Sequence, residues 1–249
     1  MLLKIFIIVF YCVLFFAPGC TLHKKIITGE SYLLKSWVLD KNINKFISPN
    51  YTKDRKFWSL DSMIIAEGQL INIKEDEVGK ESWSVEVNKY TFIDLRSRSF
   101  YEYTTFTDTA KIIDKFSQPD TGRVKGGWGF FSTQSAIQLE NMTIVPDTII
   151  KNIVYKRVKS FRMIQGASGT QKELQFGYFR CDKKNSIYKL DNPLSKKMGC
   201  PVVRIEKFYP ELKSGIAYEI EFLPDKLTPE KVKIFATWKK NAKNNPVNN

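Results

Sequence analysis

Most of the chain after Trp58 alternates between apolar and polar residues, which is the pattern of β-strands that bury one face. The clearest stretch is 216–222, where every second residue is aliphatic or aromatic. In 83–95, one parity is shared by Trp83, Val85, Val87, Ile93 and Leu95, so we expect one face of that strand to be buried. We expect roughly nine to eleven strands in total. The other expected strands span 62–73, 99–106, 137–145, 152–164, 174–178 and 201–209.

Short connections rich in Gly, Pro and Ser separate these strands, for example 166–169 and 210–215. Connections of this length join antiparallel neighbours. The sequence therefore predicts a mainly β domain built from an antiparallel sheet, with one or two short helices. We find no internal repeat.

One short helix is expected at 108–116. Asp108 can cap the following amides, and Ile112, Ile113 and Phe116 then recur at helical spacing before Pro119. The segment 31–57 fits either a helix or a short strand.

The C-terminal segment has two readings. Thr228-Pro229-Glu230 is typical of a helix start. However, Val232, Ile234, Ala236 and Trp238 alternate with Lys231, Lys233 and Lys239, which favours a final strand. We expect the strand, followed by a disordered tail at 243–249 that is rich in Asn and Lys.

The N-terminal segment has a positive start at Lys4, an apolar run at 5–16, and Ala17-Pro18-Gly19 directly before Cys20. It resembles the signal peptide of a bacterial lipoprotein. The resemblance implies removal of residues 1–19 and attachment of acyl chains such as palmitate to Cys20. An ordinary secretory signal or an uncleaved anchor is the alternative. Residues 20–30 then form a tether, and 31–242 form a single domain.

Four cysteines occur in the chain. Cys12 lies inside the signal and Cys20 is the expected acyl site, which leaves Cys181 and Cys200. Two thiols in an oxidising compartment favour one disulfide bond. Two buried free thiols, or one reactive thiol, are the alternatives.

The charge and histidine content exclude several functions. His23 is the single histidine and lies in the tether, so the domain lacks the histidine that triads, multi-histidine zinc sites and histidine bases require. We therefore expect no enzyme, no cofactor and no metal. The net charge of +13 favours anionic partners such as a membrane surface. Nucleic acid is not expected as a partner of an exported protein.

One loop, 122–131, combines four glycines with cations and aromatic rings. As a candidate ligand or membrane contact, it either rims a cavity or dips into a membrane interface; the alternative is that its rings plug one end of the sheet. The acidic run 75–77 is expected to be a solvated turn. The candidate contact residues of the loop are Arg123, Lys125, Trp128, Phe130 and Phe131.

Three stretches in the C-terminal half, 147–157, 178–181 and 194–205, resemble envelope proteins of the outer-membrane lipoprotein carrier and receptor superfamily. The resemblance implies a strongly curved antiparallel sheet, or half-barrel, that wraps a helix and can hold acyl chains.

Together these features predict a non-catalytic lipoprotein of the cell envelope, anchored by lipid in the outer membrane. We expect its domain to bind an amphipathic or lipid-like anion, such as a lipid or an acylated protein segment. A structural or assembly role in an envelope complex, with a protein partner, is the first alternative. A carboxylate-based glycan hydrolase is the second.

Overall fold

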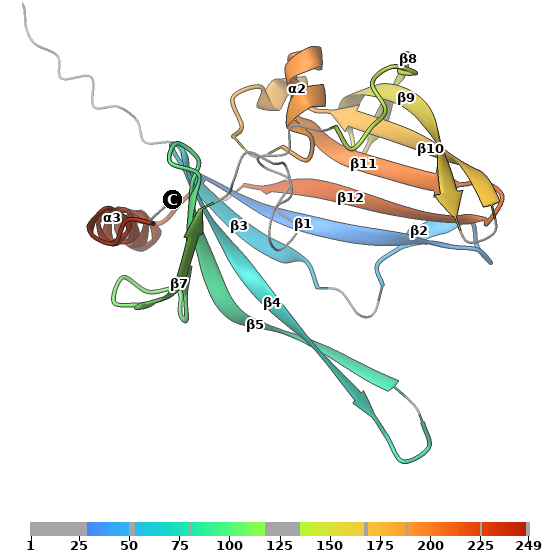
Figure 1. Cartoon of the computed structure of the whole chain (residues 1–249). Coiled ribbons are helices and arrows are strands. Elements are labelled where there is room, and N and C mark those ends of the chain that lie inside the picture. The colour runs from blue at the N-terminus through green and yellow to red at the C-terminus, as the bar shows by residue number, and fades with distance from the viewer. Residues whose placement is uncertain are drawn as a thin grey trace, which may run out of the picture.

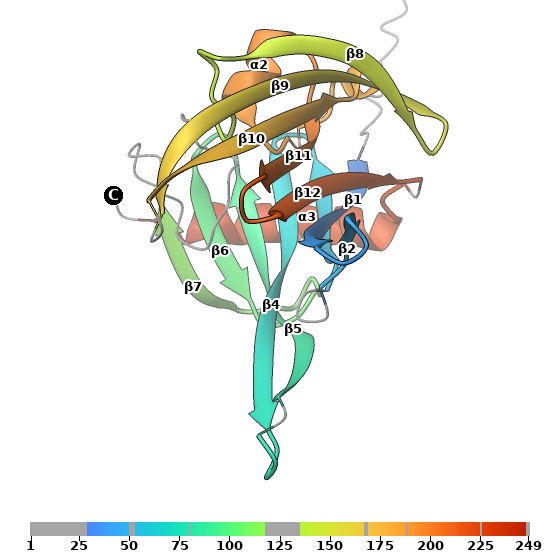
Figure 2. The ribbon, with the colours of Figure 1, turned by 90° about the vertical axis from the view of Figure 1, so that its right-hand side faces the viewer.

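The computed structural model describes residues 29–49, 53–79, 81–117, 135–166, 169–187, 189–224 and 226–247. Within these ranges, twelve strands form one open antiparallel sheet in the order β7-β6-β5-β4-β3-β1-β12-β11-β10-β9-β8, with β2 beside β1. The sheet is strongly curved, and its two ends lie on either side of the middle strands β1 and β12 (Figure 1, Figure 2). The expected fold class is confirmed.

The strands are β1 (Gly29–Asp40), β2 (Lys45–Ile47), β3 (Arg55–Leu60), β4 (Met63–Glu75), β5 (Glu81–Asp94), β6 (Ser99–Tyr103), β7 (Ile112–Ser117), β8 (Thr143–Ile150), β9 (Ile153–Gly166), β10 (Gly169–Phe179), β11 (Val202–Tyr209) and β12 (Ser214–Leu223). The described helices are α2 (Asn192–Met198), α3 (Pro229–Asn244) and the short 3-10 helix η2 (Cys181–Lys183).

The register fixes two faces across the whole sheet. On β1, Tyr32 lies opposite Phe57 of β3 and Phe222 of β12, and the neighbouring Ser31 lies opposite Trp58 and Leu223. Successive side chains point to opposite faces, so we name these the Tyr32 face and the Ser31 face. Large apolar side chains on both faces are fully buried near the centre of the sheet. Both faces therefore need covering.

Helix α3 covers the Ser31 face of β3–β6. Its Trp238 is fully buried and stacks on Tyr103 with ring centroids 3.8 Å apart. The indole Nε1 donates to the carbonyl oxygen of Thr107 at 2.9 Å. Trp238 thus satisfies its polar atom while burying its rings, which is the usual condition for a buried tryptophan. The same cluster contains Met63, Ile65, Phe92, Ile234, Phe235 and Ala242.

Helix α2 and the segment 135–142 cover the other face, the Tyr32 face, over β9–β11. Gly177 of β10 lies beneath them: a Cβ atom on it would come within 2.8 Å of Ile137 Cδ1. The backbone of β10 can therefore be approached closely only because residue 177 is a glycine. The two helices thus pack on opposite faces, over opposite halves of the sheet.

A disulfide bond joins Cys181 to Cys200, as expected from the cysteine count. It closes the loop that carries α2. Within this loop Asp191 caps α2 by accepting from the Leu194 amide at 2.8 Å, and Gly199 ends the helix in the left-handed region. The bond therefore fastens the cover of the Tyr32 face to the ends of β10 and β11.

The expected helix at 108–116 is wrong. Residues 112–117 form β7, which pairs with β6, and Phe116 stacks on Phe100 at 4.9 Å. Asp108 forms an ion pair with Lys233 of α3 at 2.6 Å. Pairing with β6 packs the half-buried Phe116 against the core ring of Phe100, and this tertiary contact outweighs the local helical spacing.

The expected final strand at 232–238 is also wrong, because these residues form α3. The Thr228 side chain accepts from the Lys231 amide and Pro229 stands at the first helical position. Ile234, Phe235, Trp238 and Ala242 are the buried residues. Their spacing is helical, and it buries the large side chains better than the alternation would. The helix continues to Asn244, past the boundary drawn at residue 242.

The structure also decides the ambiguous region 31–57 and corrects the expected burial of Trp83. The ambiguous region 31–57 forms the strands β1, β2 and β3. Trp83 was expected in a buried face but is 40% exposed, because β4 and β5 run on beyond the body of the sheet as a projecting hairpin (Figure 1). The expected solvated turn at 75–77 is exposed and lies at the tip of this hairpin.

Trp238 provides a direct test of the way α3 is held. Replacing Trp238 with Ala keeps a strong helix former but removes the ring stack and the bond to Thr107. We expect the free energy of unfolding in urea to fall by about 3–5 kcal/mol. Lys239→Ala, one residue along on the exposed side, serves as the control and should change it by less than about 0.5 kcal/mol. Equal losses in both variants would contradict this packing.

Candidate functional site

Most of the residues that the sequence marked as functional lie outside the described part of the chain. These are Cys20, Arg123, Lys125, Trp128, Phe130 and Phe131. Their roles stay predictions. Cys181 and Cys200 are described and form the disulfide.

The leading candidate site is a pocket of about 640 Å³ between the second half of α3 and the β5–β6 turn. The sheet contributes Asp94, Ser97, Ser99 and Tyr101. The helix and the residues after it contribute Ala236, Lys239, Lys240, Ala242, Lys243, Pro246 and Val247.

Helical periodicity places the three lysines at this pocket. Trp238 and Ala242 are buried and fix the rotation of α3 on the sheet. Lys239 and Lys243 are one turn apart, and Lys240 follows directly after Lys239. All three residues are exposed, so their ammonium groups can meet a ligand from solvent.

The floor of the pocket is held in place by polar contacts to the backbone. The Tyr101 hydroxyl donates to the Ala242 carbonyl oxygen at 3.2 Å, and the ring is buried. Burial raises the pKa of Tyr101, so the phenol stays neutral near pH 7. Lys115 Nζ of β7 donates to the Pro246 carbonyl oxygen at 2.9 Å. The end of α3 and the residues after it are thus tied to β6 and β7.

This pocket combines an apolar floor with a cationic rim. Its lining contains three lysines and a single carboxylate, Asp94. Such an arrangement binds a molecule with an apolar part and a negative head. A second pocket of about 410 Å³, near the disulfide, has the cations Lys156 and Arg180, but Asp147 and Asp182 also line it. Arg180 is already paired with Asp182, which makes that pocket a weaker anion site.

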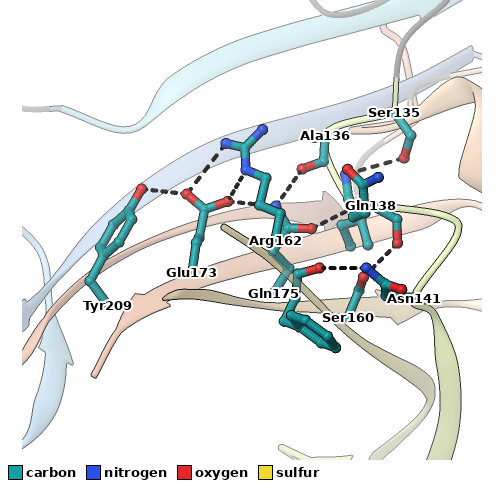
Figure 3. Close-up of polar contacts among 11 residues, drawn as sticks. Ser135, Ala136, Gln138, Asn141, Ser160, Arg162, Glu173, Gln175 and Tyr209 are labelled. Atoms are coloured by element: carbon teal, nitrogen blue, oxygen red, sulfur yellow. Dashed lines mark hydrogen bonds and ion pairs between the residues drawn. The ribbon is translucent and has the colours of Figure 1, made fainter. Parts of the chain in front are cut away.

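A buried polar network lies on the Tyr32 face near the β9–β10 hairpin (Figure 3). The carboxylate of Glu173 is fully buried. It accepts from Arg162 Nε at 2.7 Å, from the Tyr209 hydroxyl at 2.5 Å and from Gln175 Nε2 at 2.5 Å. Desolvation works to raise the pKa of Glu173, but these bonds outweigh it and the pKa is lowered. Burial and the charge of Glu173 raise the pKa of Tyr209 to about 12.

The same network fastens the segment 135–142 to the sheet. Gln175 Oε1 accepts from the Gln138 amide at 2.6 Å, and the Ser160 hydroxyl donates to the Gln138 carbonyl oxygen at 2.5 Å. Figure 3 shows the chain of bonds from Tyr209 through Glu173 and Gln175 to the backbone of Ala136 and Gln138. Because every oxygen of Glu173 already has a donor, we interpret the network as structural rather than as a proton donor or acceptor for a substrate.

Among the residues that the structure describes, no group of three or more His, Cys, Asp or Glu side chains is placed to bind a metal ion. Within the same ranges, no helix is both long and apolar enough to cross a membrane.

Solved structures show a distant likeness in fold. The lipoprotein LppX of Mycobacterium tuberculosis has a TM-score of 0.31 at 10% identity, covering 79% of this chain and 86% of its own. LprF of Mycobacterium bovis has 0.31 at 7%, covering 82% and 90%. A putative outer membrane lipoprotein-sorting protein domain of Vibrio parahaemolyticus has 0.30 at 7%, covering 86% and 91%. No family model and no curated protein matches the chain. Likeness at this level assigns neither a family nor a function.

The sequence did not reveal the pocket, because the segment that carries the lysines was expected to be a strand. The available signal was the Thr228-Pro229-Glu230 helix start. If the segment is taken as a helix that starts there, Lys239 and Lys243 lie one turn apart on one side, and Lys240 lies on the adjoining side. The partners on β5 and β6 could not be inferred without the register of the sheet.

The Glu173 network predicts a pH dependence of stability. Since its pKa is lower in the folded state, Glu173 stabilises the fold above about pH 4.5, and this contribution is lost as the pH falls through the folded-state pKa. Glu173→Gln removes the charge, so we expect a loss of about 2 kcal/mol at pH 7. The difference from wild type should shrink as the pH is lowered from 5 to 3. Urea unfolding across this range measures both.

Glu211→Gln is the control, since Glu211 is an exposed carboxylate in the β11–β12 turn. It should have little effect at either pH. A loss for Glu173→Gln that stays constant from pH 7 to pH 3 would show that the charge of Glu173 does not stabilise the fold.

Proposed function

We propose that this protein is a non-catalytic lipoprotein of the cell envelope whose folded domain binds an amphipathic anion in the pocket under α3. The main support for this proposal is that three lysines line the rim of a pocket whose apolar floor is formed by Tyr101, Ala242 and Val247. The lysines can pair with a phosphate or carboxylate head, while the floor accepts hydrocarbon.

The size and charge of the site support this proposal. A volume of about 640 Å³ lies within the usual range for sites of small organic ligands. The chain as a whole carries a net charge of +13, which attracts anions over long range and raises their rate of encounter. The same charge favours a position beside an anionic bilayer.

The acidic residues give less support to a hydrolase of glycans. That chemistry needs two carboxylates facing each other across a groove. Asp94 is the single carboxylate lining the pocket under α3, and Glu173 is fully buried with its oxygens occupied. We therefore favour binding over catalysis.

The lysines give the first test. Lys239→Ala, Lys240→Ala and Lys243→Ala, combined in one chain, keep helix propensity but remove the cationic rim. We expect the affinity for lysophosphatidylglycerol, measured by calorimetry, to fall by at least about tenfold. The affinity for the zwitterionic lysophosphatidylcholine should be weaker from the start and change little.

The matched control is Lys196→Ala combined with Lys197→Ala, which removes exposed lysines of α2 far from the pocket. It should bind lysophosphatidylglycerol like the wild type. If the triple variant also binds like the wild type, or if both lipids bind equally well, the proposed pocket is not the anion site.

The lipid anchor is the second part of the proposal. We infer that Cys20 is acylated after removal of residues 1–19 and that the protein is held at a membrane of the envelope. Cys20→Ser should move the protein from the membrane fraction to the soluble fraction and remove the acyl mass from the mature chain. Cys12→Ser, inside the same signal, is the control and should leave both unchanged. Mass spectrometry that finds Met1 on the wild-type protein would refute the processing.

A further inference from the structure

Residues 69–79 and 81–87 form a two-stranded arm that projects from the body of the sheet (Figure 1, Figure 2). The arm begins at a β-bulge, where the register shifts between Gly68 and Gln69. Pairing of β4 with β3 stops at Ala66, and pairing of β5 with β6 stops at Tyr90. Within the described chain, the arm strands therefore pair only with each other, and both of them are edge strands.

One face of the arm is apolar. Ile71 lies opposite Val85, and Ile73 lies opposite Trp83. Ile71 is 46% exposed and Ile73 is 56% exposed, although both belong to regular strands. The opposite face of the arm carries polar pairs such as Asn72 opposite Ser84. An amphipathic two-stranded ribbon is marginally stable on its own, so its apolar face is suited to docking.

The arm is also acidic in a basic protein. The sequence stretch 69–87 contains five carboxylates and two lysines, so its net charge is −3 in a chain of +13. An anionic membrane would repel this tip. A basic protein surface with apolar side chains between its cations is the complementary partner.

The chain itself presents such a surface on the Ser31 face of β9–β11. Phe161, Leu174 and Phe208 lie side by side across the three strands, and Met163 lies opposite Lys172 in the next row. Lys172 Nζ lies 4.7 Å from the centroid of the Phe161 ring. We call these residues, together with Lys159, the Phe161 patch.

The Phe161 patch is open and cationic. Phe161 is 39% exposed and Met163 is 57% exposed. The nearest carboxylate in the register, Glu206, is already bonded to Arg204 and to the Tyr178 hydroxyl. Helix α3 covers the same face only over β3–β6. The patch therefore offers apolar area with uncompensated lysines.

We propose that the arm of one copy docks on the Phe161 patch of a second copy of this chain. The apolar face of the arm covers Phe161, Leu174 and Met163, and the acidic tip meets Lys159 and Lys172. Both sides of the contact are present in one sequence, so the complementarity of charge and of apolar area is satisfied without another protein. This association does not depend on the ligand of the pocket under α3.

Cysteine cross-linking in the full chain tests the contact directly. A chain with Ile73→Cys and a differently tagged chain with Met163→Cys are co-expressed, and disulfide-linked heterodimer is measured on non-reducing gels. We expect at least about tenfold more heterodimer than in two controls. The first control pairs Asn72→Cys, on the opposite face of the arm, with Met163→Cys. The second pairs Ile73→Cys with Lys196→Cys on α2.

A charge swap supplies the second arm of the test. Lys159→Glu with Lys172→Glu should reduce the cross-link at least about fivefold. Glu75→Lys with Glu77→Lys in the Ile73→Cys chain should restore it. Equal cross-linking in all pairs, or no rescue by the swap, overturns the proposal. So does the absence of a cross-link together with binding of the arm to anionic vesicles that Ile73→Ser abolishes.

Discussion

The structure depends on one constraint: a single antiparallel sheet has two faces, and in this chain both are apolar near the centre. Tyr32 and Ser31 point to opposite faces of β1, and the pairing of β1 with β3 and with β12 continues these two faces onto both neighbours. Hydrophobic burial is the main favourable term in folding, so each face needs its own cover. The chain solves this with α3 on the Ser31 face of one half and with α2 and 135–142 on the Tyr32 face of the other. Trp238 anchors α3 in the core, and the Cys181–Cys200 bond closes the loop that carries α2.

This division of the two covers also explains where a ligand can bind. The second half of α3 leaves a gap beside the β5–β6 turn, and Tyr101 and Val247 line this gap. Because the buried side of the helix is set by Trp238 and Ala242, lysines one residue away are placed at the rim of that gap. The pocket and its charge are consequences of how the sheet is covered. The Glu173 network differs from the pocket because its polar groups bond to each other and to the segment 135–142 and leave none for a ligand.

Sequence reasoning succeeded where a signal was local and the structure followed it. Alternation located most strands, and the count of cysteines identified the Cys181–Cys200 pair. It failed where tertiary contacts chose between two local readings. Phe116 fits helical spacing, but stacking on Phe100 makes its segment a strand. Residues 232–238 alternate, but the stack on Tyr103 and the Thr228 cap make them a helix. The site depends on that helix and on its register against β6, so it could not be predicted from a segment expected to be a strand.

Within the described residues, the arm is the part of the sheet that has neither a neighbouring strand outside the β4–β5 pair nor a covering helix. Pairing with the outer neighbours stops at Ala66 of β4 and at Tyr90 of β5, and beyond these residues the two strands pair, among the described strands, only with each other. Alternation in the sequence does continue, and this is why Trp83 was expected to be buried. An apolar face that persists past the edge of the core costs solubility, and acidic residues at its tip offset that cost only in part. In the proposed contact the basic Phe161 patch of a second copy covers this face, and the arm and the patch belong to opposite halves of the sheet.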